Sequence, residues 1–291
     1  MNNLIEDIYK ALEPLSDGKG IALSEEDIEN FGENIKKVMS SWSNPVKRDT
    51  EFSIRMSNVG LHPRKLWYDS RYKYTGEKNK IKPSTQIKFL YGHLLEELVL
   101  LLVKLSGHDV TAEQKEVMVE GVSGHLDCII DDEVVDIKTA SGFAFYKFRN
   151  GTLREDDPFG YLGQLAGYEE SEGTDNGGFL VINKESGELC LYCPEDLDKP
   201  NIISKIKTIK KCLKKKSPPK EYCYNPIPDG QKGNEKLHKN CGWCPYKFKC
   251  FKDSNGGKGL RTFEYAKGNA YLTKVVVEPR VPEVTDELQA M

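Results

Sequence analysis

The hydrophobic pattern of the chain changes from helical spacing to strand spacing and back again. Residues 1–45 predict one or two amphipathic helices, the second of which is capped at Ser24. A turn-rich segment leads to a long predicted helix over 84–105, with Gly107 as its stop signal. Three short Val- and Ile-rich runs, separated by Gly or Asp-Asp-Glu turns, then predict strands: QKEVMVEGV, GHLDCII and EVVDIKTA.

Helical and strand patterns then alternate. A helix is predicted from Asp157-Pro158 through FGYLGQLAGYEE, followed by a hairpin of GGFLVINK and ELCLYC. A lysine-rich helix, NIISKIKTIKKCLKKK, precedes a Cys-rich segment and a tail that we expect to fray after about residue 275. The order predicts an α/β fold with a mixed central β-sheet flanked by helices.

Composition limits the class of protein. The 291 residues are 38% hydrophobic and 30% charged, which is ordinary for a globular chain with one large core or two modest ones. A net charge of −3 means that any DNA binding must come from local patches. We expect no membrane segment or signal peptide, and therefore a cytoplasmic location, or the host cytoplasm if the protein is viral. Eight cysteines without a secretion signal favour metal binding or buried thiols.

The hairpin GHLDCIIDDEVVDIK carries an unusual set of charges. Asp136 and Lys138 are two apart on a strand and therefore share a face, and the turn should bring Asp127 opposite Asp136. Converging carboxylates suit Mg²⁺ or Mn²⁺, and a lysine beside them can orient water or balance phosphate charge. For the Asp-x-Lys tripeptide alone, a surface ion pair is the commoner explanation.

The long helix adds two further acids. Leucine and valine cover nearly its whole circumference around Glu96 and Glu97, and neither has a Lys or Arg within four residues. A buried carboxylate must protonate or find a cation, and a metal shared with Asp127 and Asp136 is one such cation. His93 could assist, and one of the two glutamates should point to solvent.

Gln164 and Tyr168 lie four apart on one face of the next predicted helix, with Tyr161 one turn earlier. Gly160, Gly163 and Gly167 give this helix a close-packing surface. On its own, this pattern is explained by helix packing more often than by a functional role.

Taken together, these motifs resemble the PD-(D/E)xK nuclease superfamily, in its RecB-type branch, over residues 52–252. GHLLEE matches the helix motif at Glu96, GHLDCII the first aspartate strand, and VVDIKTA the acid-x-lysine strand. The chain departs from the family at Leu126, where proline is usual, and at Asp136, where glutamate is commoner. The resemblance implies a restriction-endonuclease-like core and assigns metal ligands and catalytic residues: Glu96, Asp127, Asp136 and the Ile137 carbonyl as ligands, Lys138 to orient water, and Gln164 and Tyr168 to position substrate or Lys138.

The segment CGWCPYKFKC gives a C-x₂-C-x₅-C spacing at Cys241, Cys244 and Cys250, which is typical of metal ligands. It is similar to the cluster of iron–sulfur RecB-type nucleases, including helicase-associated, phage-encoded and CRISPR-adaptation enzymes. There the fourth thiolate lies upstream, where this chain has His62. Either His62 or Cys223 is the fourth ligand, and we favour Cys223. A [4Fe–4S] cluster is expected, with zinc as the alternative, in a structural role. The remaining cysteines (Cys128, Cys190, Cys193 and Cys212) are predicted to be ordinary thiols.

Two basic surfaces are candidates for DNA contact. One is the lysine-rich helix, whose default role is a solvated face: Lys205, Lys207, Lys210, Lys211, Lys214, Lys215 and Lys216. The other is the segment with Arg64, Lys65, Trp67 and Tyr68, which could grip a strand end. His125, two residues before Asp127 and expected on the same strand face, could approach a phosphate, although a structural histidine is commoner.

The predicted organisation has four segments: an N-terminal helical region (1–50), a nuclease core (51–222), a cysteine segment (223–255) and a partly flexible C-terminal extension (256–291). The predicted function is a Mg- or Mn-dependent deoxyribonuclease, an exonuclease of recombination, repair or phage DNA metabolism, with a helicase or recombination protein as a further partner. The alternatives are an inactive DNA-binding module of the same fold and an iron–sulfur structural or redox protein.

Overall fold

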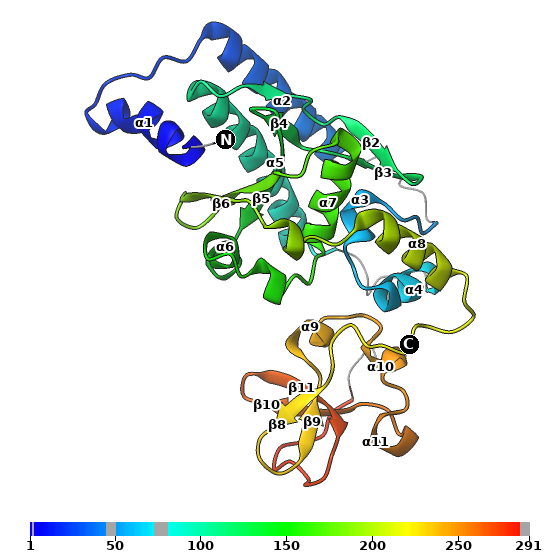
Figure 1. Cartoon of the computed structure of the whole chain (residues 1–291). Helices are drawn as coiled ribbons and strands as arrows, with labels where there is room; N and C mark the ends of the chain where they lie inside the picture. Colours follow the sequence, from blue (N-terminus) through cyan, green and yellow to red (C-terminus); the bar gives the residue numbers. More distant parts are fainter. Residues whose placement is uncertain (2, 45–50, 73–80, 286–291) are drawn as a thin grey trace. The chain divides into compact units, whose positions relative to one another are not determined.

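The computed structural model describes residues 1, 3–44, 51–72 and 81–285, and the chain forms two compact units (Figure 1). The first comprises Met1–Leu61 and Tyr72–Lys211, and the second His62–Arg71 and Cys212–Met291. The division differs from the predicted segments in two ways. The N-terminal helices belong with the core, and the second unit begins at Cys212 and takes in the distant stretch His62–Arg71.

A five-stranded mixed sheet forms the centre of the first unit. The strands β5 (Glu133–Ala140) and β6 (Gly178–Asn183) run parallel, and the other neighbours are antiparallel. A separate two-stranded hairpin consists of β2 (Glu116–Val119) and β3 (Val122–His125). The order across the large sheet is β1 (Val110–Thr111), β4 (Cys128–Ile130), β5 (Glu133–Ala140), β6 (Gly178–Asn183) and β7 (Leu189–Tyr192).

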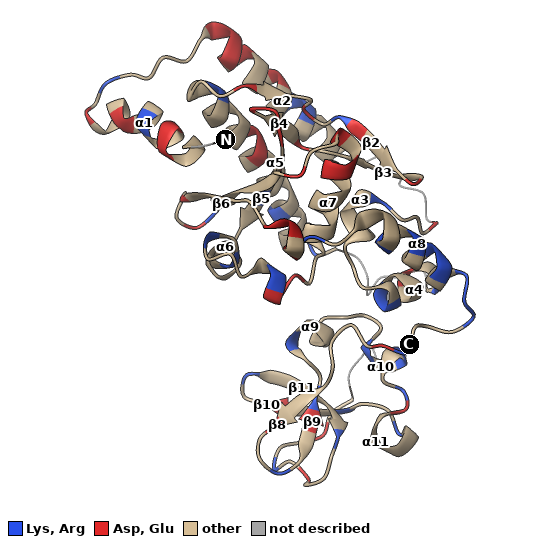
Figure 2. Ribbon diagram, in the orientation of Figure 1, with Lys and Arg blue, Asp and Glu red and all other residues tan. Residues whose placement is uncertain are grey.

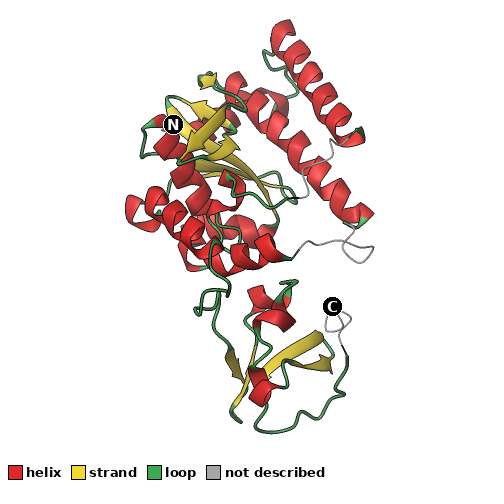
Figure 3. Cartoon of the chain, turned by 90° about the vertical axis from the view of Figure 1, so that its right-hand side faces the viewer, coloured by secondary structure: helices red, strands yellow, loops and turns green. Residues whose placement is uncertain are grey.

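Helices flank this sheet, so the predicted α/β class is confirmed (Figure 3). The helices α1 (Leu4–Ser16) and α5 (Pro83–Leu105) share a hydrophobic core with one face of the sheet. The opposite face meets α7 (Tyr161–Glu172), and Phe148 of α6 (Gly142–Arg149) packs edge-on against Phe179 of β6 at 5.4 Å. The other described helices of this unit are α2 (Glu25–Ser43), α3 (Met56–Val59) and most of α8 (Ile202–Leu213), with short 3₁₀ turns at Leu153–Glu155 and Asp196–Asp198.

Several predicted element boundaries are confirmed and others shift for identifiable reasons. The capping box at Ser24 is present, and the helix predicted over 84–105 is α5. The helix predicted from Asp157 begins at Tyr161, because the Asp157 carboxylate accepts the backbone N–H groups that start it. The run GHLDCII is two strands in different sheets, since the chain leaves β3 after His125 and enters β4 at Cys128.

Glycines bring α7 close to the segment that precedes the second unit, as the sequence predicted. A Cβ atom added at Gly163 would lie 2.5 Å from the Cα atom of Gly60. Any side chain at Gly163 would therefore push α7 away from this neighbour.

The second unit contains a four-stranded antiparallel sheet that the hydrophobic pattern did not predict. Its order is β10 (Arg261–Tyr265), β11 (Gly268–Lys274), β9 (Asn234–Lys236) and β8 (Ile227–Asp229). The helices of this unit are α4 (Pro63–Arg71), α9 (Lys239–Gly242), α10 (Lys247–Cys250) and α11 (Ser254–Gly257).

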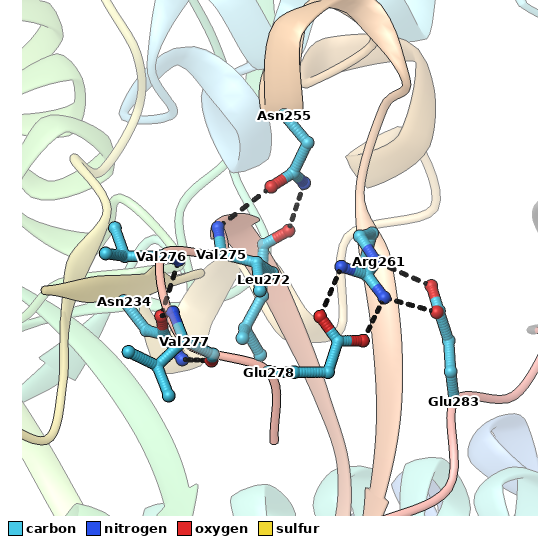
Figure 4. A network of polar contacts seen from close by, with 9 residues as sticks. All are labelled: Asn234, Asn255, Arg261, Leu272, Val275, Val276, Val277, Glu278 and Glu283. Carbon is cyan, nitrogen blue, oxygen red and sulfur yellow. Dashed lines mark hydrogen bonds and ion pairs between the residues drawn. The ribbon is translucent and has the colours of Figure 1, made fainter. Parts of the chain in front are cut away.

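The tail beyond residue 275 is anchored, which corrects the expectation that it frays there (Figure 4). The Arg261 guanidinium donates to the carboxylates of both Glu278 and Glu283. The Asn234 side chain accepts the N–H groups of Val276 and Val277, at 2.7 and 2.9 Å. These hydrogen bonds hold the segment that follows β11 against the sheet.

No helix in the described part of the chain is both long enough and apolar enough to cross a membrane.

Candidate active site

Asp136 and Lys138 form an ion pair in the interior of the first unit. Both project from β5, and the Lys138 Nζ lies 2.5 Å from the Asp136 Oδ2. Asp136 is 0% exposed, and apart from this ion pair its carboxylate oxygens have no hydrogen-bond partner among the described residues. A carboxylate buried in this way is costly, so the pair differs from the surface ion pair that the tripeptide alone suggested.

Asp127 lies beside this pair. Its Oδ2 accepts the backbone N–H of Ile137 at 2.8 Å, just before β4 pairs with β5. Burial and the neighbouring Asp136 charge raise the pKa of Asp127 well above its usual range, although Lys138 opposes the shift. Burial alone would lower the pKa of Lys138, but the two aspartates outweigh it and raise that pKa. The two acids and the ammonium are therefore brought together as predicted from the strand period.

Glu96 approaches this group from α5. Its Oε1 accepts the Gln114 side-chain amide at 2.9 Å, and its Oε2 lies 3.8 Å from the His93 Nδ1. Its charge contributes to the raised pKa of Asp127, after the larger effects of burial and Asp136. Glu96 therefore belongs to the same cluster as Asp127, whereas Glu97 does not.

Glu97 turns toward α2 instead of solvent, which corrects the expectation for the second glutamate. Its Oε2 accepts the Asn34 side-chain amide at 3.0 Å. Burial raises the pKa of Glu97, and this hydrogen bond opposes the shift. The sequence could not reveal Asn34, because it lies 63 positions away.

A cavity of about 910 Å³ opens beside these acids. Its walls come from α2 and α5, and Glu96, Glu97 and Asp127 reach it. The cavity gives the carboxylates access to a ligand from outside, which Asp136 alone, being buried, does not have.

The helix α7 contributes a chain of hydrogen bonds on the other side. Gln164 donates to the Tyr168 hydroxyl at 2.9 Å, and that hydroxyl donates to the backbone carbonyl of His125 at 2.7 Å. Burial and then the Asp136 charge raise the pKa of Tyr168, so this phenol lies near the acidic group.

Tyr161, which the sequence analysis assigned no role, contacts the lysine. The Lys138 Nζ lies 5.1 Å from the centroid of its ring. In the sequence, the position of Tyr161 one turn before Gln164 was the signal that could have indicated this role. His125 is exposed on the separate hairpin, so the expectation that it shares a strand face with Asp127 is wrong.

Four thiols gather in the second unit, from Cys223, Cys241, Cys244 and Cys250. Burial raises the pKa of Cys223 to about 11 and that of Cys241 to about 12, and the neighbouring thiols add to both shifts. The Arg64 Nε lies 3.0 Å from the Cys250 Sγ. The fourth thiol of the group is thus Cys223, and the His62 Nδ1 accepts the Arg64 backbone N–H at 3.2 Å.

The other cysteines are ordinary thiols, in agreement with the sequence. Cys128 and Cys190 are buried, Cys193 is exposed, and Cys212 is partly buried. Nothing beyond packing is required of them.

The prediction that α4 presents basic and aromatic side chains to DNA is wrong. Arg64, Trp67 and Tyr68 are only 6–7% exposed, and Lys65 forms an ion pair with Asp69 at 2.7 Å. The Trp67 indole donates to the Lys215 carbonyl at 2.9 Å. These side chains build the interior of the second unit and do not present a surface to DNA.

Lysines are concentrated on α8 and on the residues that follow it, where the ribbon is largely blue (Figure 2), and they form two groups. Lys205 donates to the Gly60 carbonyl at 2.8 Å, and Lys207 and Lys210 contact Glu120. The exposed lysines that follow are Lys211, Lys214, Lys215 and Lys216.

Neither group of donors is a ready-made metal site. Among the described residues, no three or more His, Cys, Asp or Glu side chains have the spacing needed to hold a metal ion. The carboxylates and the thiols nevertheless have the donor chemistry for one: hard oxygens in the first unit and soft sulfurs in the second.

Comparisons with known proteins give distant likenesses in fold. No family model matches the sequence, and no curated protein does. Among solved structures, the chain is similar to the crystal structure of SSO0001, with a TM-score of 0.41, 19% identity and coverage of 75% of this chain and 93% of that one. It is also similar to an alkaline exonuclease (LHK-Exo) from Laribacter hongkongensis, with a TM-score of 0.36, 14% identity and coverage of 54% and 89%. Similarity at this level assigns no activity to the chain.

Proposed function

We propose that this protein is a metal-dependent DNA nuclease, and specifically an exonuclease. The observation that carries the proposal is the buried Asp136 carboxylate, which has Lys138 as an ion-pair partner and Asp127 beside it. Two neighbouring buried carboxylates with a single ammonium leave one negative charge unbalanced, which favours a further bound cation. The resemblance of the motifs to the RecB-type PD-(D/E)xK nucleases supports the same function.

Asp127 and Asp136 would hold Mg²⁺ or Mn²⁺. Mg²⁺ is usually bound through one or two carboxylates, with waters and substrate phosphate completing its shell, so a preformed cage of three protein ligands is not required. Glu96 would join after exchanging its hydrogen bond with Gln114, and the Ile137 carbonyl is the expected backbone ligand. The ion would supply Lewis acidity at the scissile phosphate and neutralise developing charge.

Lys138 acts as a cation in this proposal. The aspartates raise its pKa, so its ammonium stays protonated near neutral pH and is not a general base. It orients the attacking water and stabilises negative charge on the phosphate.

Gln164, Tyr168 and Tyr161 are positioning residues. The Gln164–Tyr168–His125 hydrogen bonds fix α7 against β3, and the ring of Tyr161 confines the Lys138 ammonium. Through these contacts α7 holds the lysine where β5 presents it.

We assign a [4Fe–4S] cluster, with zinc as the alternative, to Cys223, Cys241, Cys244 and Cys250. Each thiol has neighbouring thiols or a positively charged partner, and Cys223 accepts a backbone hydrogen bond from Lys65. Bound metal would neutralise four partly buried sulfurs and tie His62–Arg71 to the rest of the second unit. The role is structural.

The biological setting of this activity is DNA recombination, repair or phage DNA metabolism. DNA is the substrate, and a helicase or recombination protein is the expected partner. The exposed lysines after Lys210 would contact phosphate without reading sequence. The site of action is the cytoplasm, or the host cytoplasm for a viral protein.

The test is digestion of linear DNA labelled at its 5′ or 3′ end, in Mg²⁺, Mn²⁺ or EDTA, beside a closed circle of the same sequence. The proposal predicts metal-dependent release of labelled mononucleotides or short fragments from linear DNA and an intact circle. Binding without digestion in either metal would instead identify an inactive DNA-binding module of the same fold. Cutting of the circle would overturn the assignment as an exonuclease.

A further inference from the structure

We infer that the cavity between α2 and α5 receives the unpaired end of a single DNA strand, with Trp42 and Phe89 stacking on its bases. This inference rests on the proposed nuclease function and names the form of the substrate. The cavity connects these aromatics to Glu96 and Asp127 without leaving the first unit.

The helix α2 makes this cavity. Its 19 residues include no fully buried side chain, so it adds little to the hydrophobic core. It runs beside α5 and is joined to it by the hydrogen bond from Asn34 to Glu97 at 3.0 Å. The helix α2 therefore forms one side of the cavity, and the candidate active-site residues Glu96 and Asp127 line the same cavity.

Two aromatic side chains on the facing helices are exposed at the cavity. Trp42 of α2 is 42% exposed and Phe89 of α5 is 52% exposed, and both line it. Large aromatic surfaces are normally buried, and their exposure around a cavity marks a binding site. Every nucleic-acid base offers a flat face, so such side chains bind single strands without a sequence requirement.

The charged side chains that line the cavity indicate how a DNA strand would enter it. Lys37 lines the same cavity and can meet a phosphate, whereas four carboxylates make the rest of its charged lining acidic: Glu96, Glu97, Glu113 and Asp127. Phosphate would be repelled there unless a divalent cation is present. The strand therefore enters past the aromatics and reaches the acids only when the metal is bound.

From the size of the cavity we infer that it admits a single strand more readily than a duplex. A volume of about 910 Å³ is near the upper end of pockets that enclose a small organic ligand, which suits one or two nucleotides. A duplex is far wider, since its major groove alone measures about 12 Å. A blunt end must unpair before it enters, so an overhang should be the better substrate.

The experiment measures the affinity of the full chain for a dye-labelled oligothymidylate and for a blunt hairpin duplex by fluorescence anisotropy. It uses the Lys138→Ala chain in Mg²⁺, which keeps DNA intact, and the wild type in EDTA. In Mg²⁺, Trp42→Ala and Phe89→Ala should each weaken single-strand binding by about tenfold and duplex binding by less than twofold. Tyr91→Ala is the matched control, since Tyr91 is 47% exposed on the same helix and is not among the described residues that line the cavity.

A second readout follows Trp42 directly. Trp67 is 6% exposed and Trp243 is 92% exposed, so in a Trp243→Phe background the single strand should quench the emission of Trp42. Melting temperatures equal to that of the parent chain show that the variants are folded. Equal loss of single-strand and duplex affinity, or no loss in either aromatic variant, would overturn the inference, as would tighter binding of an oligouridylate than of the DNA strand.

The nuclease activity and the strand-binding role of the cavity can be refuted separately. Metal-dependent digestion that is insensitive to both aromatic substitutions, on overhangs as on blunt ends, leaves the nuclease and removes the cavity as its strand-binding site. Aromatic-dependent binding of single strands without digestion by the wild type removes the nuclease and leaves the cavity as a binding site.

Discussion

The Asp127 carboxylate accepts the backbone N–H of Ile137, at 2.8 Å, and this hydrogen bond fixes the first acid to the strand that carries the second acid and the lysine. A side chain at the entrance to β4 is thereby held in register with the interior of β5. The cluster of Asp127, Asp136 and Lys138 is thus a property of one hairpin, and Glu96 is added to it by the packing of α5.

The charge of Asp127 should destabilise the metal-free chain. Burial and Asp136 raise its pKa, so ionised Asp127 is unfavourable in the folded state, while an asparagine keeps an oxygen to accept the Ile137 N–H. Asp127→Asn should raise the melting temperature in EDTA by about 2–4 °C, equivalent to about 1 kcal/mol. Mg²⁺ should raise the melting temperature of the wild type and not that of the variant. A larger Mg²⁺ effect on the variant would contradict the assigned ligand.

The ring of Tyr161 should matter more than its hydroxyl. Tyr161→Phe keeps the aromatic face 5.1 Å from the Lys138 Nζ, and Tyr161→Leu removes it. A cation–π contact contributes about 1 kcal/mol, so Tyr161→Leu should lower kcat about fivefold with little change in KM, whereas Tyr161→Phe should retain wild-type kcat. Steady-state digestion of a labelled oligonucleotide measures both constants. Equal losses in the two variants would show that the hydroxyl is the active part.

The fourth cysteine ligand can be identified by metal content. Cys223→Ser should lose most of the bound iron or zinc, because its thiol lies with Cys241, Cys244 and Cys250, whereas His62→Ala should retain it. Cys193→Ser is the control, as an exposed thiol of the first unit. Elemental analysis of protein purified without oxygen gives the content, and absorbance near about 400 nm separates iron–sulfur from zinc. Loss of metal from His62→Ala alone would reverse the assignment.

Two glycine substitutions should change stability in opposite directions. Gly163→Ala places a Cβ 2.5 Å from the Cα of Gly60 and should destabilise the fold by about 1–3 kcal/mol. Gly92→Ala lies in α5, where an added Cβ meets nothing within 4 Å, and should stabilise the chain by up to about 1 kcal/mol. Urea denaturation measures both. Similar changes in the two variants would mean that the close approach of α7 is not needed.

The predictable part of the site follows from local periodicity. Period two along a strand places Asp136 with Lys138, and a short turn places Asp127 beside them. The four-residue spacing of Gln164 and Tyr168 predicts their hydrogen bond. The leucine-rich surroundings of Glu96 indicated a buried acid that needs a partner.

The features of the fold and the site that the sequence did not predict depend on contacts between distant segments of the chain. In the sequence, Arg64 and Trp67 have the pattern of an exposed DNA-contacting surface. In the structure they are buried against residues more than 140 positions away. The strands β8 and β9 have only three residues each, and β10 and β11 show no clear alternation of buried and exposed positions, so these four strands were not predicted. The wall formed by α2 is equally invisible in the sequence, because amphipathic spacing does not say which surface a helix will meet.

The most direct test compares the wild type with Lys138→Ala in single-turnover digestion of linear DNA, at equal DNA occupancy and with an EDTA control. The account predicts Mg²⁺-dependent cutting by the wild type, none in EDTA, and a rate at least about a hundredfold lower for Lys138→Ala with its DNA affinity retained. Cutting by Lys138→Ala at the wild-type rate would contradict the account.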